Sequence, residues 1–178
     1  MSSFLDKGRA KEKKAVRKDT SSKITDSSVS EITYSKTQIA QYLSEHEKIR
    51  QLFTMALMAY QQNEDKAFLQ HLRDLQMALR RHLLDEELNL YIYLRQCHKQ
   101  NTNKRELITR FKKNSKQTGL HIFSYIKNVT ELPSKIRREE ADVSQLLQIG
   151  NMLEALFYAE EQHLYPIYKK PERTTALS

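Results

Sequence analysis

The sequence has few of the residues that interrupt helices. Its 178 residues include three glycines, three prolines and no tryptophan. Because glycine and proline are the poorest helix formers, their scarcity favours long helices joined by short turns. A single cysteine, Cys97, excludes a disulfide within the chain and suits a reducing compartment. The composition therefore predicts an all-α, cytoplasmic protein.

Several other features are absent. No apolar run approaches the length of about 18 to 20 residues that crosses a bilayer, so we expect no transmembrane segment. The first thirty residues lack the apolar core of a secretory signal. No glycine-rich phosphate loop, zinc-protease helix motif or Ser-His-Asp order is present. We therefore do not expect an enzyme.

The charge is basic and uneven. Thirty basic and 22 acidic residues give a net charge of +8, and residues 1–30 carry half of it, from eight basic and four acidic side chains. Such a composition is typical of a solvated, disordered tail, which we expect over residues 1–33. A basic tail can also contact nucleic acid, an anionic membrane surface or an acidic protein.

The rest of the chain divides into four amphipathic segments. Polar or proline-containing breaks at 61–63, 101–103 and 130–134 separate them. Long amphipathic helices with short connections predict an up-down-up-down four-helix bundle over residues 34–168, followed by a C-terminal tail over 169–178. The helices are expected at about 35–60, 64–98, 104–129 and 138–165.

The second helical segment carries a histidine and a glutamate on its apolar face. His82 and Glu86 are four residues apart, about one helical turn, so both side chains leave the same side. An ionised group in a helical core must find a partner, because burying it unpaired costs several kcal/mol. A metal ion is one such partner.

The chain also contains an internal repeat. Residues 82–91, His-Leu-Leu-Asp-Glu-Glu-Leu-Asn-Leu-Tyr, align with residues 156–165, Leu-Phe-Tyr-Ala-Glu-Glu-Gln-His-Leu-Tyr, 74 positions later. His46 in the first segment matches His121 in the third at a shift of 75. Two related helical hairpins would bring the inward side chains to one central site. These side chains are His46, His82, Glu86, His121 and Glu160.

This pattern resembles the hemerythrin-like, HHE cation-binding family over about residues 34–168. The motifs are a histidine on helix one, His-x-x-x-Glu-Glu-x-x-Leu-Tyr on helix two, a histidine on helix three, and a second Glu-Glu-x-x-Leu-Tyr-Pro on helix four. The resemblance implies that His46, His82 and His121 are terminal nitrogen ligands. It also implies that Glu86 and Glu160 are carboxylates able to bridge two irons.

One position departs from the family pattern. The family pattern has a fourth histidine, four residues before the Glu-Glu pair of helix four. In this sequence Leu156 occupies that position, and leucine cannot coordinate a metal. Three outcomes follow: a mononuclear or weak site, a rescued site, or a bundle that has lost its metal. His163 is the candidate for rescue, because it lies three residues after Glu160, a spacing that di-iron carboxylate bundles use.

Two other features of the repeats bear on the site. Glu87 and Glu161 follow the inward glutamates and point about 100° away, so we expect them to face solvent or to support the ligands. Gly119 lies inside the third segment, where a glycine indicates a close helix contact.

The leading hypothesis is a protein that binds non-haem iron, mononuclear or dinuclear. It would sense or bind a small diatomic ligand such as oxygen or nitric oxide, or handle iron. The alternative is a metal-poor helical interaction module whose basic tail binds nucleic acid, membrane or an acidic protein. The sequence indicates no oligomeric state.

Overall fold

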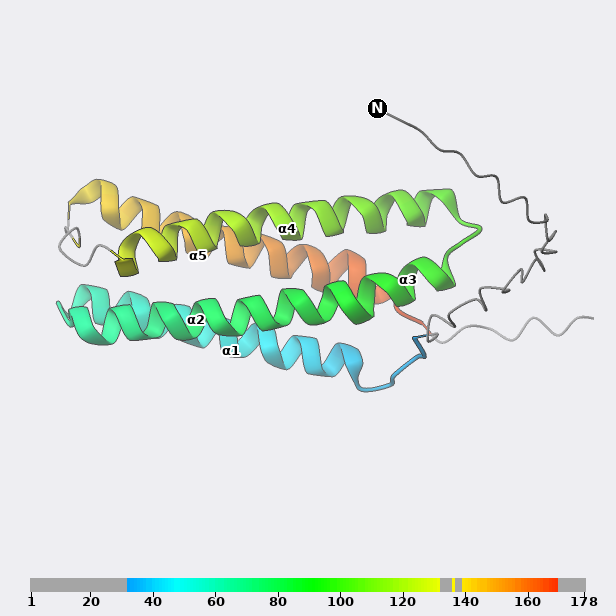
Figure 1. The fold of residues 1–178 in the computed structure, drawn as a ribbon, viewed down its shortest axis with the longest axis horizontal. Helices are drawn as coiled ribbons and strands as arrows, with labels where there is room; N and C mark the ends of the chain where they lie inside the picture. The colour runs from blue at the N-terminus through cyan, green and yellow to red at the C-terminus, as the bar shows by residue number, and fades with distance from the viewer. Residues whose placement is uncertain (1–31, 132–135, 137–138, 170–178) are drawn as a thin grey trace, which may run out of the picture. The chain divides into compact units, whose positions relative to one another are not determined.

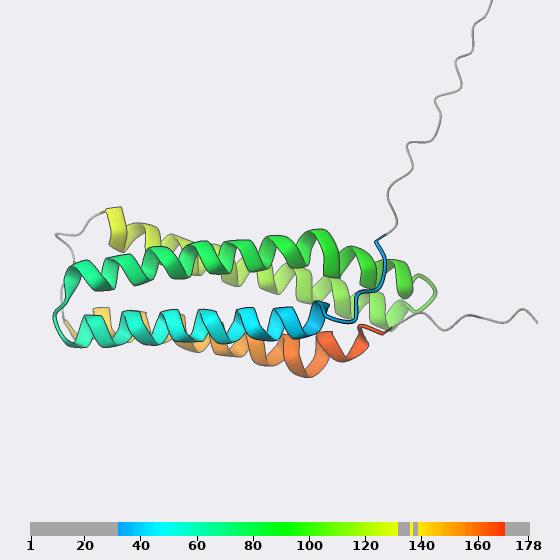
Figure 2. The same cartoon turned by 90° about the horizontal axis from the view of Figure 1, so that it is seen from below.

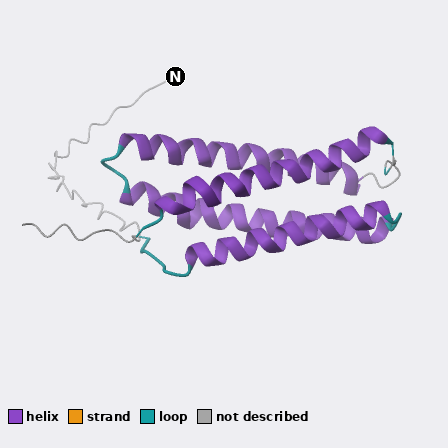
Figure 3. Ribbon diagram, turned by 180° about the vertical axis from the view of Figure 1, so that it is seen from behind, coloured by secondary structure: helices purple, strands orange, loops and turns teal. Residues whose placement is uncertain are grey.

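The computed structural model describes residues 32–131, 136 and 139–169, and all regular structure in this part of the chain is helical. The four long helical segments lie side by side as a bundle (Figures 1 and 2), and the view from behind shows them joined by short loops where the connections are described (Figure 3). The elements are α1 Gln38–Gln61, α2 Asp65–Asp85, η1 Glu86–Leu90, α3 Tyr91–Cys97, α4 Thr102–Glu131, α5 Glu140–Ala159, η3 Glu160–Leu164 and η4 Tyr165–Ile167.

The second and fourth segments each change their helical geometry partway along. The elements α2, η1 and α3 follow one another without a break, and η1 is a five-residue π-helical turn. The same kind of turn, η3, follows α5. We call α1 with the segment α2, η1 and α3 the first hairpin, and α4 with the segment α5, η3 and η4 the second hairpin.

The first hairpin closes over three residues. Asn63 has a φ of 61°, in the left-handed region that asparagine tolerates better than most residues. The chain can therefore reverse without glycine, and the Glu64 N–H donates to the Ala59 carbonyl across the turn at 2.9 Å. The turn lies where the break at 61–63 predicts it. The corresponding prediction at 130–134 falls mostly outside the described residues, as do most of the predicted tails 1–33 and 169–178.

The apolar core consists of two clusters. One includes Ile49, Leu79, Ile122 and Leu153, and the other includes Tyr42, Leu90, Ile108 and Leu164. Polar residues lie between the two clusters. They come from α1, from α2 with η1, and from η3. We call these residues the polar layer: His46, His82, Glu86 and Glu160, each at most 1% exposed.

The third long helical segment, α4, contributes no titratable side chain to this layer. Its buried stripe runs through Ile108, Ser115, Gly119, Ile122 and Ile126. His121 is exposed, so the prediction that it points inward is wrong. The physical reason is that α4 turns its small residues towards the other helices. Because Ser115 and Gly119 have little apolar character, a search for large apolar residues does not identify their side of the helix as the inward one.

Gly119 marks a close contact, as its position in the helix indicates. A Cβ at residue 119 would lie 2.6 Å from Leu83 Cδ1. The side chain of Leu83 from α2 therefore fills the space that a side chain at residue 119 would need.

None of the helices in the described part of the chain is both long enough and apolar enough to cross a membrane.

Candidate metal centre

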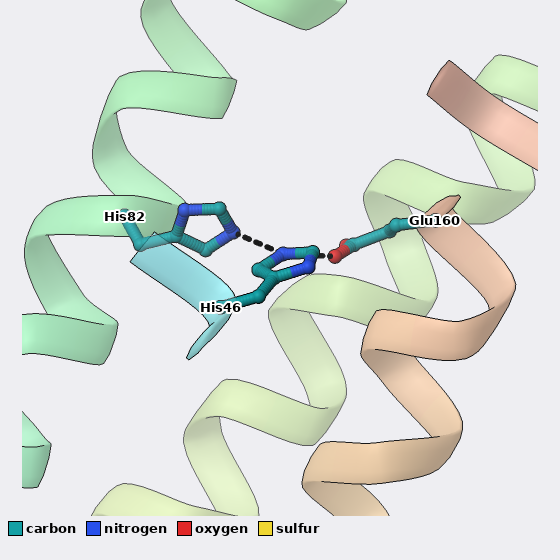
Figure 4. A group of neighbouring side chains, drawn as sticks. All are labelled: His46, His82 and Glu160. Carbon is teal, nitrogen blue, oxygen red and sulfur yellow. Dashed lines mark hydrogen bonds and ion pairs between the residues drawn. The ribbon is translucent and has the colours of Figure 1, made fainter. Parts of the chain in front are cut away.

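Two imidazoles and a carboxylate meet in the polar layer (Figure 4). His46 Nε2 lies 3.0 Å from His82 Nε2 and 3.4 Å from Glu160 Oε2. Glu86 Oε1 is 3.8 Å from His82 Nε2. One nitrogen or oxygen from each of His46, His82 and Glu160 lies within 4.8 Å of the others, close enough to share one metal ion.

Helix geometry positions these groups from three separate segments. His82 and Glu86 are one turn apart at the end of α2, and both are fully buried, as their spacing predicts. Each glutamate of the layer is the first residue of a π-helical turn, Glu86 in η1 and Glu160 in η3. These two turns lie 74 residues apart, the shift of the sequence repeat. Single π-turns inside α-helices occur frequently at functional sites.

Carboxylates outside the layer orient both imidazoles. His46 Nδ1 lies 2.8 Å from Glu161 Oε1, and His82 Nδ1 lies 2.9 Å from Glu45 Oε2. A carboxylate only accepts hydrogen bonds, so each Nδ1 carries the proton and donates it. Each Nε2 is then the atom that can offer a lone pair to a metal. We call Glu45 and Glu161 the outer carboxylates.

Both outer carboxylates are themselves held in place. The Arg50 guanidinium donates to Glu161 Oε1 at 3.1 Å and to both oxygens of Glu154. The Gln41 amide donates to Glu45 at 2.9 Å. The hydrogen bond with His82 lowers the pKa of Glu45, so this carboxyl is ionised at neutral pH. Such support fixes the ring orientation and raises ligand basicity.

The imidazole of His46 is neutral. Burial and the nearby His82 lower the pKa of His46 to about 2. The ring stacks on Phe157 with centroids 3.9 Å apart, which excludes water from that face. The two Nε2 atoms lie 3.0 Å apart, so a proton or a cation is needed to join them.

The carboxyl groups of the layer are electrostatically strained. Burial raises the pKa of Glu160 well above its ordinary value, and the charge of Glu86 raises it further. Burial also raises the pKa of Glu86, offset in part by His82 and by the hydrogen bond from Tyr165. Two carboxyls that share one buried space resist ionising together unless positive charge joins them.

The Tyr165 phenol connects the two hairpins. Its hydroxyl donates to Glu86 Oε1 at 2.9 Å and also lies 3.0 Å from His46 Nε2. A phenol has one proton and cannot donate fully to both acceptors. Burial and the charges of Glu86 and Glu160 raise the pKa of Tyr165, so it stays protonated.

The donor set fits a divalent metal. Among the described residues, three buried carboxylate oxygens have no hydrogen-bond partner: Glu86 Oε2, Glu160 Oε1 and Glu160 Oε2. Two nitrogen ligands at right angles on one ion, each bonded at about 2.1 Å, lie about 3.0 Å apart, which matches the two Nε2 atoms. A cation there would accept both lone pairs and neutralise the carboxylates.

The structure brings together four of the six residues that the sequence suggests: His46, His82, Glu86 and Glu160. It does not bring His121 or His163 to them, because both are exposed. For His163, the reason is that the inward face of η3 is occupied by Glu160 and Leu164. Rescue of the site by His163 is therefore not supported. Leu156 is buried, so the position that matches His82 offers only a hydrocarbon side chain.

The second hairpin also lacks an imidazole at the position that matches His46, because Gly119 lies there. The buried residues of α1 and α4 match at a shift of 73, which pairs His46 with Gly119 and Ile49 with Ile122. The sequence match of His46 to His121 was two residues out of register. The second hairpin therefore has glycine and leucine where the first has its two histidines.

Sequence reasoning did not identify Tyr165, Glu45 and Arg50 as parts of the site. Two of them carried a signal. Tyr165 repeats Tyr91 at the shift of 74, and Glu45 directly precedes His46. Arg50 carried none, because its role depends on where α5 places Glu154 and Glu161.

Comparisons with family models, with curated proteins and with solved structures find no match to this chain.

Proposed function

We propose that this chain is a hemerythrin-like, up-down-up-down bundle that binds a single non-haem iron ion in its polar layer. His46 and His82 would supply nitrogen ligands, Glu160 a carboxylate, and Glu86 a second carboxylate at slightly longer range. Two histidines with one carboxylate and open coordination positions are the donor set that non-haem Fe(II) sites use. The supporting resemblance lies in the sequence motifs.

The observation that carries the proposal is the orientation of the two imidazoles. Both rings offer Nε2 to the same point, because both Nδ1 atoms are tied to carboxylates from other parts of the bundle. A satisfied core histidine has no need of this arrangement. Four titratable groups in one buried layer, with three carboxylate oxygens unpartnered, cost free energy that a cation would offset.

A bound iron with open positions would supply reversible coordination of a small ligand such as oxygen or nitric oxide. The chain's own residues would control that chemistry. Phe157 and the apolar clusters on both sides exclude water. The Tyr165 hydroxyl carries a proton and faces the layer, so it would donate a hydrogen bond to an acceptor there. We therefore propose sensing or binding of a diatomic ligand, or handling of iron.

The iron content of the purified protein tests this proposal directly. Purified protein is stripped with chelator, loaded anaerobically with Fe(II), desalted and assayed for iron. We expect about one iron per chain. His82→Ala should lower the affinity by more than about 100-fold, because it removes a ligand and leaves Glu45 without its partner. The matched control is His121→Ala, a histidine outside the layer.

Two results would contradict the proposal: no retained iron in the unaltered protein, or an equal loss of iron in the His121→Ala control. Competition against Mn(II), Co(II) and Zn(II) in the same assay tests the identity of the metal. Because Zn(II) generally binds nitrogen and oxygen donors more tightly than Fe(II), relative affinity alone does not assign it. Binding of nitric oxide by the iron-loaded protein, followed by absorption, tests the ligand.

One observation favours the interaction-module alternative. The helix α4 carries seven basic and two acidic residues, whereas α5 has three acidic and no basic ones. A basic helical face favours polyanions, with an affinity that falls steeply as salt rises. Binding to heparin or duplex DNA that survives metal removal, and that needs α4 or residues 7–23, would support this function. The exposed basic residues of α4 include Arg105, Arg110, Lys113, Lys116 and Lys127.

A further inference from the structure

A pocket of about 500 Å³ lies between α2 and α4, beside Gly119. This volume falls within the usual range for small-molecule sites. The pocket occupies the side of the bundle where the second hairpin lacks an imidazole. Its walls include Leu83 and Phe123, and two strongly exposed leucines flank it, Leu84 at 56% and Leu120 at 59% exposure.

The polar groups of this pocket are mainly hydrogen-bond donors. Tyr91 contributes a phenol that is 2% exposed; the Ser115 hydroxyl donates to its oxygen, and no side chain among the described residues accepts its proton within hydrogen-bond distance. The buried hydroxyl of Ser115 and the ammonium of Lys116 also line the pocket. The single carboxylate, Glu87, is paired with Lys112. A buried donor without an acceptor is unfavourable, and a ligand oxygen would accept the proton that the phenol offers.

We propose that this pocket binds a small monocarboxylate with an apolar body. The carboxylate would accept a hydrogen bond from Tyr91 and lie beside the charge of Lys116, while Leu83, Leu84 and Phe123 cover the hydrocarbon. None of these residues is a proposed metal ligand, so the site can be tested in metal-free and in metal-loaded protein.

Binding of 4-fluorobenzoate to the full chain is measured by fluorine NMR. The neutral analogue for comparison is 4-fluorobenzyl alcohol. We expect saturable binding of the acid with a Kd of about 1 mM or tighter, reasonable for about ten non-hydrogen atoms. The alcohol should bind at least about tenfold more weakly, because it lacks the charge. The result should be the same for metal-free and metal-loaded protein.

Two variants test the donors, each with a matched control. Tyr91→Phe should weaken binding of the acid about tenfold, the usual effect of losing a hydrogen bond to a charged group. Lys116→Met, an exposed change with little risk to folding, should weaken it about threefold and flatten its salt dependence. The controls Tyr158→Phe and Lys113→Met change an exposed tyrosine and a lysine that do not line the pocket, and should leave the Kd unchanged.

The proposal would be overturned by the absence of saturable binding, by equal affinity for the acid and the alcohol, or by unchanged affinity in both Tyr91→Phe and Lys116→Met. Iron loading is measured on the same samples. Carboxylate binding without iron would leave this pocket intact and reject the metal proposal, and iron without carboxylate binding would do the reverse.

Discussion

The two hairpins of the bundle share a plan, but only one of them carries the imidazoles. In the first hairpin, His46 and His82 lie opposite each other, with Glu86 one turn beyond His82. In the second hairpin, Gly119 and Leu156 hold the matching positions, and Glu160 alone remains in the layer. Both hairpins keep the π-turn and the tyrosine that follows it. The comparison shows that the backbone geometry does not depend on the imidazoles, because the second hairpin has the same π-turn without them.

The same contrast extends to the groups around the layer. Glu161 reaches across to His46 Nδ1, whereas its counterpart Glu87 pairs with Lys112. Tyr165 binds Glu86 and contacts His46, whereas no side chain among the described residues accepts the proton of its counterpart Tyr91. Glu161 and Tyr165 therefore both have partners in the first hairpin. Their counterparts Glu87 and Tyr91 have no histidine or carboxylate partner in the second hairpin.

The largest effect within this comparison should separate Glu161 from Glu87. Glu161→Gln removes the negative charge that favours the proton on His46 Nδ1 and leaves only a weaker amide acceptor, so we expect iron affinity to fall about 10- to 100-fold. Glu87→Gln is the matched control at the other hairpin and should change the affinity less than about twofold. Chelator competition on the two variants measures both values. Equal losses would mean that the two hairpins contribute alike, and the comparison would fail.

Much of the fold was predictable from the sequence, for physical reasons. Few glycines and prolines, with apolar residues every three or four positions, specify helices, and the breaks at 61–63 and 101–103 separate them where the structure does. The pair His82 and Glu86 followed from helix geometry alone, since a four-residue spacing fixes the face. Those predictions depend on distances within one helix.

The errors concern how one helix rotates against another. His121 was predicted to point inward because it matches His46 at a shift of 75, whereas Ser115 and Gly119, which do face inward, carry little apolar signal. The inward side of α4 is set by the close approach of Leu83 at Gly119, a contact between helices. The outer carboxylate Glu161 and its guanidinium partner Arg50 likewise depend on the placement of α5 against α1. Sequence periodicity does not contain that information.

A second effect concerns the stability of metal-free protein. Glu160 is buried, its oxygens lack hydrogen-bond partners and burial raises its pKa. The free energy of unfolding therefore falls as the pH rises above about 4.5, the ordinary value for a glutamate, towards the pKa of Glu160 in the folded protein. Glu160→Gln removes this loss. We expect the variant to match the unaltered protein near pH 4.5 and to exceed it by about 1–2 kcal/mol at pH 8.

Glu86→Gln is the control at the first hairpin. Glu86 already accepts a hydrogen bond from Tyr165 and faces His82, so its replacement should give little gain or a loss. Chemical denaturation of chelator-treated protein at several pH values measures the free energy of unfolding of both variants. A gain of equal size in both would show that the two carboxylates are equivalent in the absence of metal.

The smallest expected change is a second metal in the second hairpin. Leu156→His recreates beside Glu160 the four-residue pair that His82 makes with Glu86. We expect iron content to rise from about one towards two per chain, with the second ion held more weakly because residue 119 supplies no imidazole. The control is Leu156→Gln, which buries a polar group of similar size without an aromatic nitrogen. A rise in both variants, or in neither, would contradict the proposed equivalence of residues 82 and 156. Gly119→His should not complete the pair by itself, because Leu83 already fills the space at that position; it needs Leu83→Ala as well.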